Sequence, residues 1–204
     1  MGRPIDRSRA GFRPWVLRLG SGPIGWAVAF LAMAGASLGV SCDDGNDGSQ
    51  VPDIPYCDPV ANWSSEWLTW EARMVDLMNE ARAQGATCGS TPFASTGPLE
   101  PDPRLRCAAR VHSRDMYVRE FFDHTNPDGE GPTERFHKAG WSGSTWGENI
   151  VGGYGSVEAQ FAGWMGSEGH CRNIMNSSFT QVGIGYFHGS GGYGDYTTAG
   201  FGRP

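Results

Sequence analysis

Hydrophobic periodicity changes along this chain, from helical spacing in its middle to strand-like runs near its end. Apolar residues recur every three or four positions in three stretches, 65–85, 102–116 and 156–165. This spacing predicts amphipathic helices that each bury one face. Asp102, which is followed by proline, and Ser156 are favourable N-caps for the second and third of these helices.

Strand-like runs follow the helices. Residues 182–187 and 193–201 are predicted as two strands joined by a glycine-rich hairpin loop. Residues 86–101 are predicted as loop, and residues 133–139 as a short helix ended by a glycine. Because the helices come first and the strands late, the pattern favours an α+β layered domain over a doubly wound one.

The N-terminus has the composition of an export signal. Five arginines and one aspartate precede an uncharged, largely apolar run that extends from Leu19 to Ser41, which predicts a signal over residues 1–41. The run Leu38-Gly-Val-Ser-Cys42 is similar to a lipoprotein processing site and predicts lipid attachment at Cys42. An uncleaved membrane anchor is the alternative, since the run is nearly long enough to span a bilayer. Residues 42–65 are predicted as a flexible tether. The domain is therefore expected outside the cytoplasm, in the cell envelope or secreted.

Charge argues against nucleic acid as a partner. The chain has 16 basic and 22 acidic residues, a net charge of −6. Residues 1–41 hold five of those bases and one of those acids, so the remainder has 11 and 21, a net charge of −10. Such a surface is repelled by phosphate backbones and anionic membranes.

Four cysteines remain when Cys42 is set apart as the lipid site. Cys57, Cys88, Cys107 and Cys171 are spaced too widely for a zinc ribbon, and an oxidising compartment favours two disulfides. Spacing leaves all three connectivities open.

Three residues are the candidates for chemistry: His124, Glu148 and His170. Two imidazoles and a carboxylate suit a divalent cation such as zinc, and the same set could do acid–base work with Glu148 as the candidate base. Twenty or more residues separate each from the next, so local geometry does not bring them together. The alternative is that all three are structural, capping turns and pairing with neighbouring cations.

A family resemblance rests on motifs that occur in a fixed order across residues 66–204. They are Ala109-Arg-Val-His112-Ser-Arg-Asp-Met116, Phe121-Phe-Asp-His124-Thr, Gly147-Glu-Asn-Ile150, Trp164-Met-x-Ser-x-Gly-His170-Cys-x-Asn-Ile-Met175, Phe179-Thr-x-Val-Gly-Ile-Gly185 and Phe201-Gly-Arg-Pro204. Together they resemble the bacterial branch of the CAP superfamily, the SCP-like or cysteine-rich secretory proteins.

The resemblance implies a fold and a site. The expected fold is a three-layer α-β-α sandwich with an antiparallel central sheet. Many members gather two histidines and two glutamates in a cleft, and His124 and Glu148 match the first of each. The other two positions fall on Ser167 and Ser178, a departure from that set, and His170 is expected near the cleft instead.

The resemblance also implies a disulfide pairing and a range of functions. Similar bacterial proteins join the cysteine after the first helix to that of Gly-His-Cys, which gives Cys88–Cys171 and leaves Cys57–Cys107. The expected function is a non-catalytic, membrane-tethered binding module for a lipid, cell-wall or protein ligand, with a divalent cation in its cleft. The alternative is a metal-dependent hydrolase of the cell envelope.

Overall fold

The computed structural model describes residues 50–204. The signal predicted for 1–41, the lipid site predicted at Cys42 and the first part of the predicted tether lie outside the described residues. Within residues 50–204, no helix combines the length and the apolar character needed to cross a bilayer.

The first long helix, α1, covers Ser65–Gln84, as its spacing predicts. It ends at Gly85, whose φ of 79° lies in the left-handed region that glycine enters without strain. A Cβ built at this position would lie 2.8 Å from the carbonyl oxygen of Phe93. Glycine is therefore required for the backbone of residue 93 to pass this close.

The segment 86–101, predicted as loop, contains short strands. β1 (Ala86–Cys88) and β2 (Thr91–Phe93) form an antiparallel hairpin, and β3 (Glu100–Pro101) joins the main sheet. The loop prediction was wrong here because strands of two or three residues are too short to show a period.

The second long helix, α2, covers Pro103–Val118. The carboxylate of Asp102 accepts hydrogen bonds from the backbone nitrogens of Arg104 and Leu105, at 2.9 and 3.1 Å. These bonds satisfy two of the N–H groups that a helix start leaves without partners, which confirms the predicted cap.

Three shorter helices follow: α3 (Pro132–Lys138), α4 (Val157–Gly166) and α5 (Glu168–Met175). The first two are close to their predicted positions, and the Ser156 hydroxyl caps α4 by accepting from the Ala159 nitrogen. α5 was not predicted, because it is short and separated from α4 only by Ser167.

The main sheet has the strand order β3-β5-β6-β4. Its long strands, β4 (Thr145–Gly152), β5 (Gln181–His188) and β6 (Asp195–Arg203), are antiparallel, and β3 adds one short parallel pairing with β5. β5 and β6 were predicted from sequence, whereas β4 was not.

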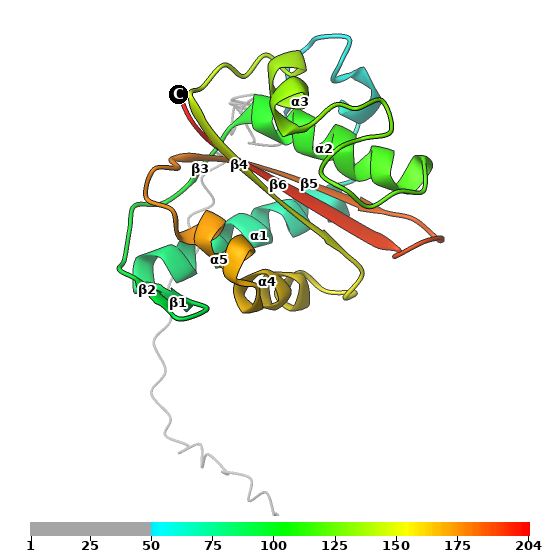
Figure 1. Cartoon of the computed structure of the whole chain (residues 1–204). Helices are drawn as coiled ribbons and strands as arrows, with labels where there is room; N and C mark the ends of the chain where they lie inside the picture. Colours follow the sequence, from blue (N-terminus) through cyan, green and yellow to red (C-terminus); the bar gives the residue numbers. More distant parts are fainter. Residues whose placement is uncertain (1–49) are drawn as a thin grey trace, which may run out of the picture. The chain divides into compact units, whose positions relative to one another are not determined.

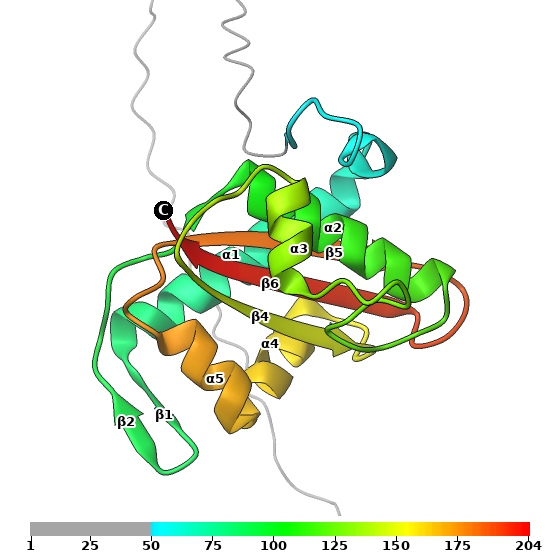
Figure 2. The ribbon, with the colours of Figure 1, turned by 45° about the horizontal axis from the view of Figure 1, so that its top comes forward.

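Figures 1 and 2 show three layers: α2 and α3 cover one face of this sheet, and α1, α4 and α5 cover the other. The larger core cluster fills the second of these interfaces with side chains such as Met74, Trp164, Ile174 and Ile184. The expected α-β-α sandwich is therefore present.

α2 lies directly on the backbone of β5. A Cβ built at Gly183 would lie 2.0 Å from the nitrogen of Arg106, and one at Gly185 would lie 2.2 Å from the nitrogen of Arg110. Because no side chain fits between helix and strand at these positions, glycine is required for the close packing.

Part of the edge of β5 is closed by a buried ion pair. Arg110 on α2 donates to both carboxylate oxygens of Glu71 on α1, at 3.0 and 2.7 Å, and their side chains are 0% and 5% exposed. The same carboxylate accepts from the backbone nitrogen of Tyr186 at 3.2 Å. Glu71 thus takes the place that a neighbouring strand would have, and links the two helical layers.

The segment before α1 packs against α2. Cys57 forms a disulfide with Cys107, 50 residues away, and both Cys57 and Val60 are fully buried against a cluster that includes Phe136 and Trp141. The short helix η1 (Asp58–Val60) lies within this segment. The tether predicted for 42–65 therefore does not extend freely up to α1, because the disulfide and apolar contacts hold residues 57–60.

A second disulfide joins Cys88 of β1 to Cys171 of α5. The structure thus contains both pairings that the family resemblance implies. This bond fixes the N-terminal turn of α5 beside the hairpin formed by β1 and β2.

Candidate binding site

Glu148 lies in the middle of β4 and points toward α3. It pairs in register with Gly200, which faces the Phe136 ring of α3. Its side chain is 2% exposed, so its charge requires a buried partner. That partner is Arg135 of α3, whose Nη2 donates to Oε1 and Oε2 of Glu148 at 2.9 and 2.7 Å.

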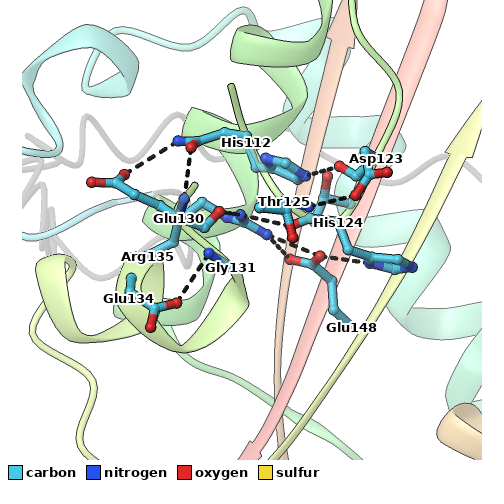
Figure 3. Close-up of polar contacts among 12 residues, drawn as sticks. His112, Asp123, His124, Thr125, Glu130, Gly131, Glu134, Arg135 and Glu148 are labelled. Carbon is cyan, nitrogen blue, oxygen red and sulfur yellow. Dashed lines mark hydrogen bonds and ion pairs between the residues drawn. The ribbon is translucent and has the colours of Figure 1, made fainter. Parts of the chain in front are cut away.

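Arg135 also holds the loop that carries the candidate histidine. Its Nη1 donates to the carbonyl oxygens of His124 and Glu130, both at 2.8 Å. Within the loop, the side-chain oxygen of Asn126 accepts from the nitrogens of Asp128 and Glu130. These contacts fix the loop to the end of α3 (Figure 3).

His124 completes the cluster from the solvent side. Its Nδ1 lies 2.8 Å from Oε1 of Glu148, and 47% of its side chain is exposed. The hydrogen bond to Glu148 raises the pKa of His124 above its ordinary value. Because Nδ1 is bound to the carboxylate, Nε2 is left at the other side of the ring for a ligand (Figure 3).

The pKa of Glu148 reflects two opposed effects. Burial acts to raise it, but the hydrogen bond from His124 and the charge of Arg135 outweigh burial and hold the pKa below its ordinary value. The carboxylate is therefore ionised and already accepts three hydrogen bonds, which leaves it poorly suited to take up a proton.

His112 lies behind this cluster and is kept neutral. Burial lowers its pKa to about 4. Its Nε2 is 2.9 Å from the carbonyl oxygen of Asp123, an acceptor, so a neutral ring carries its proton on Nε2 and donates there. The adjacent Ser113 donates to the Gly185 carbonyl oxygen at 2.7 Å, so His112 and Ser113 form no nucleophile–base pair.

His170 lies on α5. Burial lowers its pKa, and the charge of His124 lowers it further. Its carbonyl oxygen accepts from the Asn149 side chain at 3.0 Å, and Asn173 donates to the side-chain oxygen of Asn149 at 2.8 Å. α5 is thereby attached to the face of β4 opposite Glu148.

The side chains fit a complete metal site only in part. Within residues 50–204, no group of three or more His, Cys, Asp or Glu side chains is arranged to hold a metal ion. Glu148 is bound to Arg135, so it can orient His124 but cannot also serve as a direct ligand in this arrangement. A catalytic zinc with three protein ligands does not fit these residues.

The structure therefore connects His124 and Glu148 directly, whereas His170 lies on α5, at the other face of β4, and makes no direct contact with either of them. The structural alternative, in which Glu148 pairs with a neighbouring cation, is met by Arg135, but sequence reasoning did not identify which residue this partner is. It also missed Asn149 and Asn173, which fix α5. Asn149 and Asn173 lie inside quoted motifs, but nothing in the local sequence around Arg135 signals its contact with Glu148.

Comparisons with known proteins give a consistent family. The family model described as CAP, cysteine-rich secretory protein family, matches residues 75–201. The chain is 37% identical over 145 residues to the uncharacterised protein YkwD of Bacillus subtilis, which covers 70% of this chain and 52% of that protein. It is 28% identical over 123 residues to YlbC, an uncharacterised membrane protein of the same organism, which covers 60% and 33% respectively. The chain thus spans about half, or less, of these curated relatives.

Solved structures show the same fold. An extracellular protein with an SCP domain from Bacillus anthracis has a TM-score of 0.58 at 24% identity, covering 70% of this chain and 45% of that one. An outer surface protein of Borrelia burgdorferi has a TM-score of 0.55 at 17% identity, covering 70% and 96%.

Proposed function

Because the chain belongs to the cysteine-rich secretory protein (CAP) family, we propose that it is a non-catalytic binding domain that works outside the cytoplasm. Two disulfides support this location, since such bonds persist in oxidising compartments. The composition of residues 1–41 supports export, with attachment to a membrane through lipid at Cys42 or through an uncleaved anchor.

The observation that carries the proposal is the state of the Glu148 carboxylate. Arg135 and His124 occupy it, burial removes it from solvent, and its pKa is held low. A general base must be free to accept a proton at working pH. Glu148 instead acts as an orienting group that presents the outer edge of His124 to a ligand.

A divalent cation such as zinc is part of the proposal. The imidazoles of His124 and His170 are the groups that would hold it, and Glu148 would fix the ring of His124 from behind. The ligand itself, a lipid, a cell-wall component or a protein, would complete the coordination. Nucleic acid is disfavoured by the net negative charge.

The test is calorimetric titration of zinc into the full chain in mild detergent. The proposal expects affinity on the order of micromolar that is lost when both His124 and His170 are replaced by alanine. His188→Ala is the matched control. This histidine is also exposed and contacts a carboxylate, that of Asp195, but it lies at the turn between β5 and β6. Equal losses in control and double variant would mean unspecific binding, and no binding to folded wild type would remove the cation from the proposal.

Binding of ligands without zinc is tested separately. Vesicles of defined lipids and purified cell-wall fragments are assayed against wild type and His124→Ala. Weaker binding by the variant supports this site, and unchanged binding of a ligand would exclude His124 as its contact. The metal-dependent hydrolase alternative requires zinc-dependent turnover that disappears in Glu148→Gln, and the occupied carboxylate argues against it.

A further inference from the structure

A second concave site lies at the opposite end of the sheet from α5. A cavity of about 710 Å³ is formed between the C-terminal end of α2 with the residues that follow it and the turn that joins β5 to β6. Figure 1 shows these two segments at the same end of the fold. The volume is within the range of small-molecule sites.

Aromatic rings line this cavity at steep angles to one another. Phe122 and Tyr193 have ring centroids 5.2 Å apart with planes at 60°. Tyr196 lies 5.9 Å from Tyr193 at 72° and 6.1 Å from Tyr117 at 71°. Rings at steep angles to one another can flank one space from several sides, an arrangement that suits a compact cation. A sugar ring would instead stack on one flat face.

The rings form a buried floor and an open rim. Tyr196 is 3% exposed, whereas Phe122 and Tyr193 are 40% and 57% exposed. Large aromatic side chains left open around a cavity mark a binding site more often than they serve the fold, because covering them with a ligand is favourable.

The charge of the lining has one sign. Glu120 is the one charged residue among those that line the cavity, and within residues 50–204 no hydrogen bond or ion pair engages its carboxylate. Its neighbour Arg119 is turned to Asp128 and Asp115, at 2.5 and 3.5 Å. Glu120 has a φ of 57° because it is the left-handed residue that ends α2, where the Phe121 nitrogen donates to the Met116 carbonyl oxygen at 3.1 Å.

From the ring geometry and the single carboxylate we propose that this cavity binds a quaternary ammonium group, as found in the choline class of cations. The rings contact the methylated nitrogen, and Glu120 balances its charge. Anionic ligands such as free fatty acids are disfavoured, since the lining offers a negative charge and no cationic side chain. The ammonium group can come from a free small cation or from a phosphocholine lipid headgroup.

This site is built from other side chains than the His124 site. Glu148 pairs with Gly200 in the sheet, and Gly152, four positions further along β4, pairs with the cavity residue Tyr196. Four strand positions correspond to about 13 Å. The lining residues Phe121 and Phe122 lie three and two residues before His124 in the chain, so the two proposals are distinguished by their ligands, zinc for the His124 site and choline for the cavity.

The first experiment titrates choline into the full chain, followed by the chemical shifts of aromatic protons. The control ligand is 3,3-dimethyl-1-butanol, which has the shape of choline without its charge. We expect saturable binding of choline and at least about tenfold weaker binding of the alcohol, since a desolvated cation–π contact has about that worth. Equal affinities, or no saturable choline binding by folded protein, would overturn the proposal.

Variants locate the binding. Tyr193→Leu and Glu120→Gln are each expected to weaken choline binding by about five- to tenfold. Tyr154→Leu is the matched control, because Tyr154 is 63% exposed but does not line the cavity, and it should bind as wild type does. Wild-type affinity in both cavity variants would refute the site.

Vesicles then distinguish the source of the cation. Sedimentation with phosphatidylcholine vesicles is compared with phosphatidylglycerol vesicles, with and without free choline as competitor. Choline-sensitive binding to phosphatidylcholine alone assigns the headgroup, and choline binding in solution without vesicle binding assigns a free cation. Binding to both vesicle types that choline does not displace would contradict recognition of the ammonium group.

Discussion

Replacing Glu148 with glutamine tests whether its carboxylate holds the site together. The change keeps the shape of the side chain but removes the charge that balances Arg135, whose side chain is 1% exposed. Losing one partner of a buried ion pair costs about 3–5 kcal/mol. Glutamine keeps one oxygen that can accept from Arg135, so we expect the lower part of that range, about 3 kcal/mol.

The assay is urea denaturation at pH 7 with the disulfides intact, followed by tryptophan fluorescence and circular dichroism. The same loss of about 3 kcal/mol would lower the melting temperature of a domain of this size by about 6–12 °C in a thermal melt. The matched control is Glu80→Gln. It removes the same charge from a pair with Arg73 whose side chains are 55% and 39% exposed, and little change is expected.

A second readout separates an orienting role from a merely structural one. The hydrogen bond to Glu148 raises the pKa of His124, so the variant should titrate His124 at lower pH, as measured by NMR. If Glu148→Gln were no more destabilising than Glu80→Gln, the inference of a desolvated ion pair would be refuted. If stability fell but His124 titrated as in wild type, Glu148 would support the fold without orienting the histidine.

Three further predictions concern the fold. Burial lowers the pKa of His112 from 6.5 to about 4. Between these pH values the unfolded chain binds a proton at this histidine and the folded chain does not. The free energy of unfolding should therefore fall as the pH drops from 6.5 to about 4. His112→Phe should flatten this slope in urea denaturation at a series of pH values, and an unchanged slope would assign it to another group. Gly185→Ala should lower the free energy of unfolding by about 3 kcal/mol, because the added Cβ would meet the backbone of α2. Gly166→Ala is the control, since a Cβ there has no neighbour within 4 Å, and no measurable loss is expected in the same assay. Replacing both Cys57 and Cys107 by serine should lower the free energy of unfolding by about 4 kcal/mol, because the disulfide closes a loop of 50 residues in the unfolded chain. A loss under about 1 kcal/mol would mean that the unfolded chain is already compact.

Sequence periodicity predicted the elements that have one buried face. α1, α2 and α4 each present an apolar stripe to the sheet, and β5 and β6 have the β-propensity and flanking glycines that mark strands. β4 was missed because both of its faces are covered in its central part, which removes alternation, and because Gly147, Glu148 and Asn149 are unusual in strands.

The site was predictable in identity but not in arrangement. Motif order selected His124 and Glu148, and the structure places them 2.8 Å apart. Arg135 could not be selected, because its contact with Glu148 depends on how α3 packs over β4, which no local pattern encodes. The same holds for the cavity near Tyr193, whose walls come from two segments about 70 residues apart in sequence.

The bond between Cys57 and Cys107 also sets how the domain responds to mechanical force. Tension applied to the chain from its N-terminal side reaches Cys57 and passes through the covalent bond into α2, bypassing the 50 residues between the two cysteines. α1 and the small hairpin lie in this shielded span. Pulling therefore loads the interface between α2 and β5, where the backbones approach closely at Gly183 and Gly185. The force does not reach the N-terminal end of α1 until the disulfide is reduced.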